Sequence, residues 1–197
     1  MRPLGRPNPR NSRRPRQHKT RYAVFTEGRV TELQYLEKLC QRIHPQRAYF
    51  KFIKIGKDPS AIYKRCLRII KQDNFDQGII VVDVDQHERL EEMLDDCRRS
   101  PHVNALVSNP CFELWLLWHA IDRRGYTETR ECVKLARSNS LMGDKDLTAK
   151  FPIANFADAV KRAQQAWPTI TPNTKGPNPS SAMPWLIDLM TTPPPKN

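Results

Sequence analysis

The sequence has no long apolar run. It contains no stretch of about 18 consecutive apolar residues, the length that a membrane-spanning helix needs, and its mean hydropathy is −0.68. The first residues include several arginines where a secretory signal would need an apolar segment. We therefore expect a cytoplasmic protein that does not associate with a membrane.

Cysteine and glycine are also scarce. The five cysteines are odd in number and widely spaced, and no two of them form a Cys-x-x-Cys pair. This pattern argues against a zinc site and against a disulfide framework. None of the seven glycines belongs to a GxxxxGK phosphate-binding loop. The chain is therefore not expected to hydrolyse ATP through such a loop.

Positive charge is abundant and unevenly distributed. The 197 residues suit one main α/β domain and carry a net charge of +12. Eight basic residues, four prolines and no acid lie within residues 1–21, which predicts a disordered, basic, Pro-rich arm. Such an arm favours a polyanionic partner such as nucleic acid, although a solubilising tail with no specific role remains an alternative. The candidate nucleic-acid contacts in the arm are Arg10, Arg13, Arg14 and Arg16.

From Tyr22 onward, short apolar runs alternate with amphipathic segments, which is typical of βαβ units and a parallel sheet. We predict a three-layer α/β/α core over residues 22–122, with a mostly parallel, four-stranded sheet. A helical extension over residues 123–191 packs on this core, and residues 192–197 form a disordered tail. The predicted strands are residues 22–28, 49–56 (an edge strand), 78–85 (a central strand) and 102–110; the predicted helices are residues 31–43, 59–71, 89–99, 127–137, 155–167 and 182–190, together with a mostly apolar helix from Pro110 to Asp122.

Acidic residues follow two of the predicted strands. Asp83 and Asp85 end the central strand and project from the same face of the sheet. Two carboxylates so close together suit Mg²⁺ or Mn²⁺, whereas a helix cap followed by a solvated acid is the structural alternative. Glu27 ends the first strand and would face the same crevice if the first and third strands are neighbours. Lys57, which follows the second strand, is a candidate phosphate ligand.

The helix predicted from Pro110 carries two further polar candidates. Asn109 is expected to cap this helix, with Pro110 in its first turn. Glu113, in the same turn, would be either a fourth carboxylate of the site or a complement to the helix dipole. His119 lies two turns along the helix, where a hydrogen-bonded core histidine is the better interpretation.

These residues carry a family resemblance. Glu27 and Gly28 after the first strand, with Asp83 and Asp85 ending the third, resemble the Toprim domain of topoisomerases, primases and OLD-type nucleases. Four segments together are similar to the RloB family of bacterial abortive-infection proteins. They are TEGRVTELQYL (residues 26–36), VVDVDQHE (81–88), SNPCFELWLLWH (108–119) and NPSSAMPWLIDLM (178–190).

The resemblance implies a Toprim-like fold, association with a separate AAA or ABC-type ATPase, and a role in phage defence. It also implies that Asp83 and Asp85 hold the metal ion and that Glu27 binds metal or moves a proton at the scissile phosphate. The leading hypothesis is a Mg²⁺-dependent or Mn²⁺-dependent nuclease acting on DNA or RNA, with Glu27, Asp83, Asp85 and Glu113 as its catalytic residues. The alternative is a non-catalytic adaptor that binds nucleic acid or the ATPase.

Overall fold

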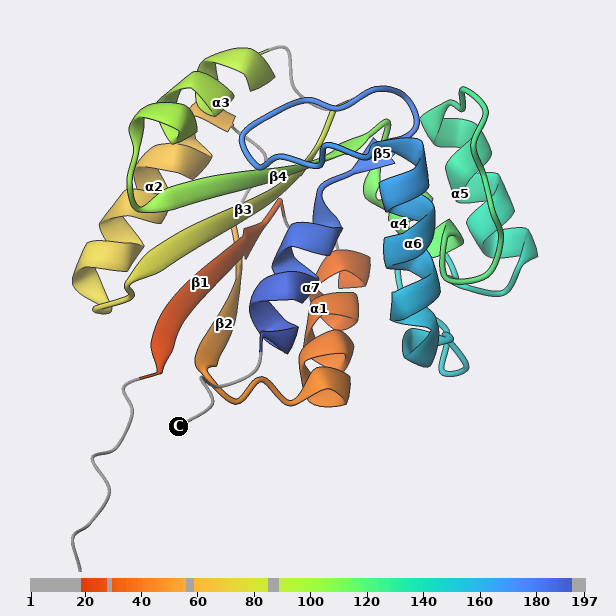
Figure 1. The fold of residues 1–197 in the computed structure, drawn as a ribbon, viewed down its shortest axis with the longest axis horizontal. Helices are drawn as coiled ribbons and strands as arrows, with labels where there is room; N and C mark the ends of the chain where they lie inside the picture. Colours follow the sequence, from red (N-terminus) through yellow and green to blue (C-terminus); the bar gives the residue numbers. More distant parts are fainter. Residues whose placement is uncertain (1–18, 28–29, 56–58, 85–88, 193–197) are drawn as a thin grey trace, which may run out of the picture.

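The computed structural model describes residues 19–27, 30–55, 59–84 and 89–192. It shows a mostly parallel β-sheet with helices against both faces (Figure 1), which confirms the predicted three-layer α/β/α class. Most of the predicted basic arm and of the predicted C-terminal tail lies outside the described residues. None of the described helices is both long enough and apolar enough to cross a membrane.

The described elements follow the predicted alternation closely. The strands are β1 (Thr20–Thr26), β2 (Ala48–Lys54), β3 (Gln77–Asp83), β4 (Val103–Asn109) and β5 (Ser180–Ser181). The α-helices are α1 (Val30–Ile43), α2 (Pro59–Gln72), α3 (Leu90–Arg99), α4 (Phe112–Leu117), α5 (Thr129–Ser138), α6 (Phe156–Ala166) and α7 (Met183–Thr191), and a short 3₁₀ helix (Ile153–Asn155) precedes α6.

The strand order is β2-β1-β3-β4-β5. The first four strands are parallel to one another, and β5 is antiparallel to β4. The second strand is therefore an edge strand and the third is central, as predicted. The sheet has one strand more than the four expected, because the two residues of β5 return from the C-terminal part of the chain and pair with Ser108 and Asn109.

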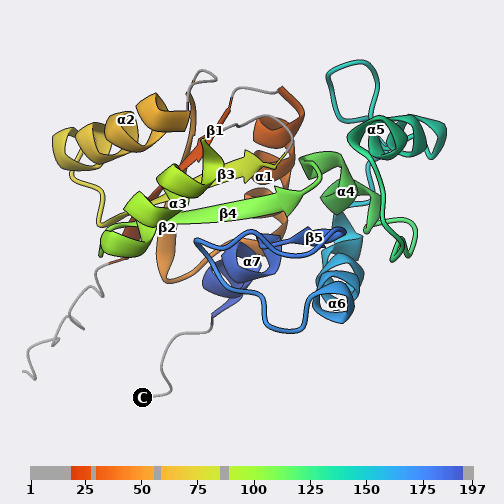
Figure 2. The same cartoon turned by 90° about the horizontal axis from the view of Figure 1, so that it is seen from above.

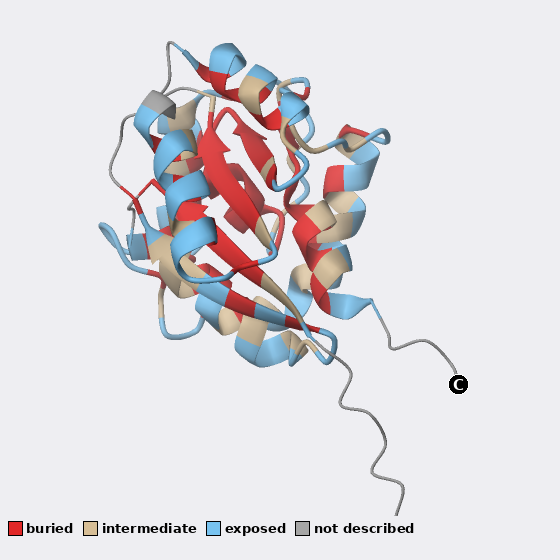
Figure 3. Ribbon diagram, turned by 90° about the vertical axis from the view of Figure 1, so that its left-hand side faces the viewer, coloured by how far each residue is buried: buried red, intermediate tan, exposed pale blue. Residues whose placement is uncertain are grey.

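Two buried clusters lie on opposite faces of the sheet. Helices α2 and α3 cover one face, and α1, α4 and α7 cover the other, with α5 and α6 packed beyond α4 (Figures 1 and 2). The parallel strands between these layers are mostly buried, whereas the outward faces of the helices are exposed (Figure 3). This burial on both faces explains why β3 is an almost continuous apolar run.

Helix α4 is shorter than the sequence predicts. It begins at Phe112 with Cys111 as its N-cap residue, rather than at Pro110. The side-chain amide of Asn109 donates instead to the carbonyl of Gly176, at 2.9 Å, so Asn109 does not cap the helix. At the other end, hydrogen bonds from His119 and Ala120 to carbonyls three residues earlier tighten the last turn and end the helix.

Candidate active site at the carboxyl edge of the sheet

The carboxyl ends of β1 and β3 lie next to each other. Thr26 pairs with Val81, so Glu27 comes directly after this register and Asp83 ends the neighbouring strand. Asp83 in turn pairs with Ser108 of β4. The condition that the sequence left open, that the first and third strands are neighbours, is therefore met, and both acids lie at one edge of the sheet.

Four acids near this edge are buried. The exposed fractions are 5% for Glu27, 2% for Glu32, 1% for Asp83 and 4% for Glu113. Aspartate and glutamate are almost never this deeply buried unless they are paired, and each of the four has an interaction partner. Buried acids thus come from the residue after β1, from α1, from the end of β3 and from α4.

Glu113 lies near this edge because the chain enters helix α4 soon after β4 ends. The short helix α4 begins directly after this edge, and Glu113 is its second residue. The pKa of the neighbouring Cys111 thiol is raised by a hydrogen bond with Cys132, by burial and by the negative charges of Glu113 and Asp83. Both carboxylates therefore lie close enough to Cys111 to affect its pKa, so Glu113 and Asp83 belong to the same buried region.

Two polar residues of this region were not singled out from the sequence. The Thr26 hydroxyl is buried and has no hydrogen-bond partner in the described structure, and Thr26 lies one residue before Glu27. Cys132, on α5, is fully buried, and its Sγ lies within hydrogen-bond distance of the Thr127 hydroxyl, at 3.7 Å. Sequence spacing gave no signal for Cys132, because its proximity to Cys111 depends on how α5 packs against α4.

The remaining site predictions have mixed outcomes. His119 is buried and bonded within the core, as expected. Thr31 is the second residue of α1, and its hydroxyl donates to the carbonyl of Lys145 at 2.5 Å. The other predicted site residues lie outside the described residues, so their roles stay predictions; they are Asp85, Lys57, Arg10, Arg13, Arg14 and Arg16.

The donor chemistry of this edge suits a hard divalent cation. Mg²⁺ is usually bound through one or two carboxylates and keeps several waters, and Glu27 and Asp83 supply carboxylates from adjacent strand ends. Within the described ranges, no three His, Cys, Asp or Glu side chains form a group that could hold a metal ion.

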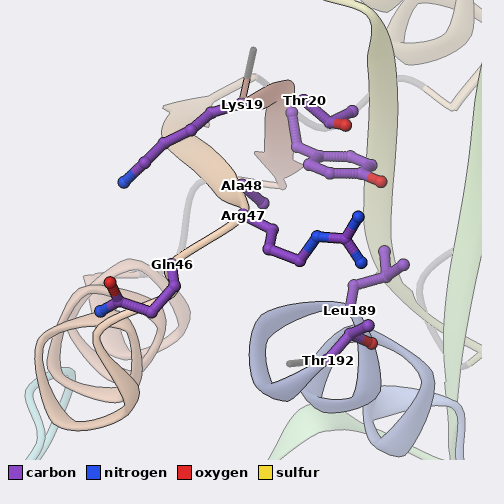
Figure 4. Close-up of a pocket in the computed structure, with 8 residues that line it drawn as sticks. Lys19, Thr20, Gln46, Arg47, Ala48, Leu189 and Thr192 are labelled. Carbon is purple, nitrogen blue, oxygen red and sulfur yellow. The ribbon is translucent and has the colours of Figure 1, made fainter. Parts of the chain in front are cut away.

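A separate cavity lies at the opposite edge of the sheet. Its volume is about 440 Å³, and it opens where β1 and β2 begin and α7 ends (Figure 4). Its described lining includes the basic side chains of Lys19 and Arg47 and no acid. This cavity is distinct from the acid-lined carboxyl edge in both position and charge.

The fold and this edge define a class: a three-layer α/β/α protein whose buried acids gather where the parallel strands end. Comparison with protein families makes the assignment narrower. The chain belongs to the RloB-like protein family, whose model matches residues 22–190, from β1 to α7. This match confirms the resemblance found in the sequence. No match is found among curated proteins or among solved structures.

Proposed function

We propose that this protein is a metal-dependent nuclease that hydrolyses phosphodiester bonds of DNA or RNA at the carboxyl edge of the sheet. The observation that carries the proposal is the burial of Glu27 and Asp83 at the ends of two adjacent parallel strands. In open α/β sheets, ligands bind in the crevice outside the carboxyl ends of the strands. A structural role in helix capping does not explain acids contributed by separate strands.

Asp83 and Asp85, together with Glu27, would hold Mg²⁺ or Mn²⁺. A divalent ion supplies two things to phosphodiester hydrolysis: it polarises the phosphoryl oxygen, and it lowers the pKa of a bound water. Glu27 would accept a proton at the scissile phosphate. Glu113, in the first turn of α4, would orient a ligand or a water from the side of β4. The unpartnered hydroxyl of Thr26 is available to donate a hydrogen bond to an acid or a phosphate.

The proposed setting follows from the family resemblance. The nuclease would be the effector of an abortive-infection system, and its ATPase would be a separate chain. In this proposal, the effector would hydrolyse nucleic acid at the carboxyl edge of the sheet, where Glu27 and Asp83 lie. The alternative, a non-catalytic adaptor of the same system, would use the same fold to bind nucleic acid or the ATPase.

Cleavage assays with conservative variants test the proposal. Plasmid DNA and total tRNA are incubated with the purified chain, with and without the ATPase, in Mg²⁺, Mn²⁺ or EDTA. Asp83→Asn and Glu27→Gln should each lower the cleavage rate by about 100-fold or more, because each removes a charge that would stabilise the transition state. EDTA should abolish cleavage by the unmodified chain.

Glu37→Gln is the matched control, because Glu37 is an exposed acid on α1 and its loss should leave the rate unchanged. Circular dichroism confirms that each variant is folded. Cleavage by Asp83→Asn at the rate of the unmodified chain would discard this site. No cleavage by the unmodified chain under any of these conditions would instead favour the adaptor.

A further inference from the structure

Helix α2 has an unusual charge composition. Its sequence, PSAIYKRCLRIIKQ, contains four basic residues and no acid. Every other described α-helix contains at least one acid. Such a composition leaves α2 with an uncompensated charge of +4, on an element that the folded core holds in place.

The four basic residues of α2 form one continuous surface, which we call the α2 stripe: Lys64, Arg65, Arg68 and Lys71. All four are exposed, and their spacing of one, three and three residues keeps them on neighbouring turns of one side of the helix. The outward side of α2 faces the viewer in Figure 3. The opposite side of the helix packs Ile62, Cys66 and Ile70 into the core.

The stripe has no counter-ion within the described residues. No hydrogen bond or ion pair joins any of its four side chains to another described residue. The adjacent helix α3 differs, because its acids pair with its own arginines, as in Arg98–Asp95 and Arg99–Asp96. Asp73, just past the end of α2, pairs with Lys51 at 3.4 Å. Asp73 and the acids of α3 are thus already engaged by other basic side chains, and the described residues supply no counter-ion to the stripe.

The composition of α2 favours one kind of binding partner over the others. The core of a protein interface is more apolar than its rim and is depleted in charged residues. Among the residues of α2 whose side chains the structure describes, Leu67 is the only large apolar one that is exposed, at 36%. An interfacial membrane helix would need a free apolar face, and the apolar face of α2 is buried on the sheet. A phosphate backbone, by contrast, is bound through charge alone.

We propose that the α2 stripe binds the phosphodiester backbone of a nucleic acid. From Lys64 to Lys71 the helix rises about 10 Å, a length over which a duplex presents about six phosphates. Helix α2 follows β2 and so begins at the carboxyl edge of the sheet. A strand lying along the stripe leads toward Glu27 and Asp83. Only this last step rests on the proposed nuclease function; binding to the stripe requires no hydrolysis.

Binding measurements in EDTA test the stripe without any dependence on cleavage. Fluorescence anisotropy of labelled single-stranded DNA, single-stranded RNA and duplex DNA is followed over a series of KCl concentrations, using the full chain. The variant replaces Lys64, Arg65, Arg68 and Lys71 with glutamine, which keeps helix propensity. The slope of log K against log [KCl] should become shallower by about 3, and the affinity should fall about tenfold or more.

A matched control removes the same charge elsewhere. It replaces four exposed basic residues of the opposite side of the molecule, beyond α4, with glutamine: Arg130, Lys134, Lys150 and Lys161. The control should keep the affinity and the salt slope nearly unchanged. A second variant, Lys64→Arg with Lys71→Arg, keeps the charge and should bind as the unmodified chain does.

Three results would overturn the proposal. The first is an unchanged slope in the α2 variant, and the second is an equal loss in the control variant. The third is binding of phosphatidylserine vesicles through the stripe with no loss of nucleic-acid binding in the variant. Failure of the nuclease proposal would appear separately, as cleavage that ignores Asp83→Asn while binding in EDTA still depends on α2.

Discussion

His119 shows how burial decides the chemistry of a single side chain. It is 1% exposed and lies among the rings of Tyr35, Trp115 and Phe151. Its Nδ1 lies 3.1 Å from the carbonyl of Trp115, which can only accept, so Nδ1 carries the proton and Nε2 accepts from the Tyr35 hydroxyl at 3.2 Å. Burial lowers the pKa of His119 to about 4, so this histidine is neutral at pH 7.

This lowered pKa predicts a loss of stability in mild acid. The ordinary pKa of 6.5 applies to the unfolded chain, which therefore takes up a proton before the folded chain does. The free energy of unfolding should fall by about 2 kcal/mol between pH 7 and pH 5 because of this residue alone. Urea unfolding at these two pH values measures the difference.

The comparison needs two variants. His119→Gln should lower stability at pH 7 and remove most of the change between the two pH values. His102→Gln alters an exposed histidine and should leave that change intact. If His119→Gln keeps the full pH dependence, another group is responsible for it.

At the level of single residues, the sequence identified much of the candidate site. Glu27 and Asp83 could be placed because an acid directly after an apolar run marks a strand end, and strand ends meet at one edge of a parallel sheet. Glu113 could be singled out because it is an acid in the first turn of a mostly apolar helix. Thr26 gave no signal, because a threonine within a strand is ordinary until its neighbours leave its hydroxyl without a partner.

At the scale of elements, α2 rests against β3 at a glycine. A Cβ atom added to Gly78 would lie 2.6 Å from Cys66 Sγ and 2.6 Å from Ile70 Cδ1, both on α2, and 3.3 Å from Phe25 Cε2 on β1. The two shortest of these distances are below any ordinary contact, so a side chain at this position would force Cys66 and Ile70, or the helix that carries them, to shift. The absence of a side chain at Gly78 sets the position of the helix that carries the α2 stripe.

Gly78→Ala should therefore destabilise the fold. Overpacking of this kind costs about 1–3 kcal/mol, measured as a lower midpoint in urea unfolding. Gly125→Ala is the control, because a Cβ there would meet nothing within 4 Å, and it should change stability little. Equal effects of the two substitutions would show that the contact between α2 and β3 can relax freely.

The periodicity of the sequence predicted most of the elements, because the first four strands and the helices around them are long enough to show it. It could not predict β5. That strand has two residues, and its pairing with Ser108 and Asn109 joins positions more than 70 residues apart. The local sequence before Ser180 is rich in proline and predicts a loop. The pairing of β5 therefore depends on tertiary packing.

For the whole molecule, positive charge is the main electrostatic feature. The chain carries +12, and the arm before β1 holds most of that excess. Replacing Arg10, Arg13, Arg14 and Arg16 with glutamine should make the salt slope of nucleic-acid binding shallower by about 3, if each arginine contacts one phosphate. The anisotropy titration in EDTA measures this change. An unchanged slope would show that the arm makes no phosphate contact.

The two ends of the described fold meet in one core. Val24 of β1 and four residues of α7, Met183, Leu186, Ile187 and Met190, belong to the same buried cluster. During synthesis, the ribosome releases β1 long before α7, so this cluster cannot close until nearly the whole matched region has been translated. We expect nascent chains that lack α7 to remain open and protease-sensitive. The nuclease activity proposed above would in this way be delayed until translation of the chain is nearly complete.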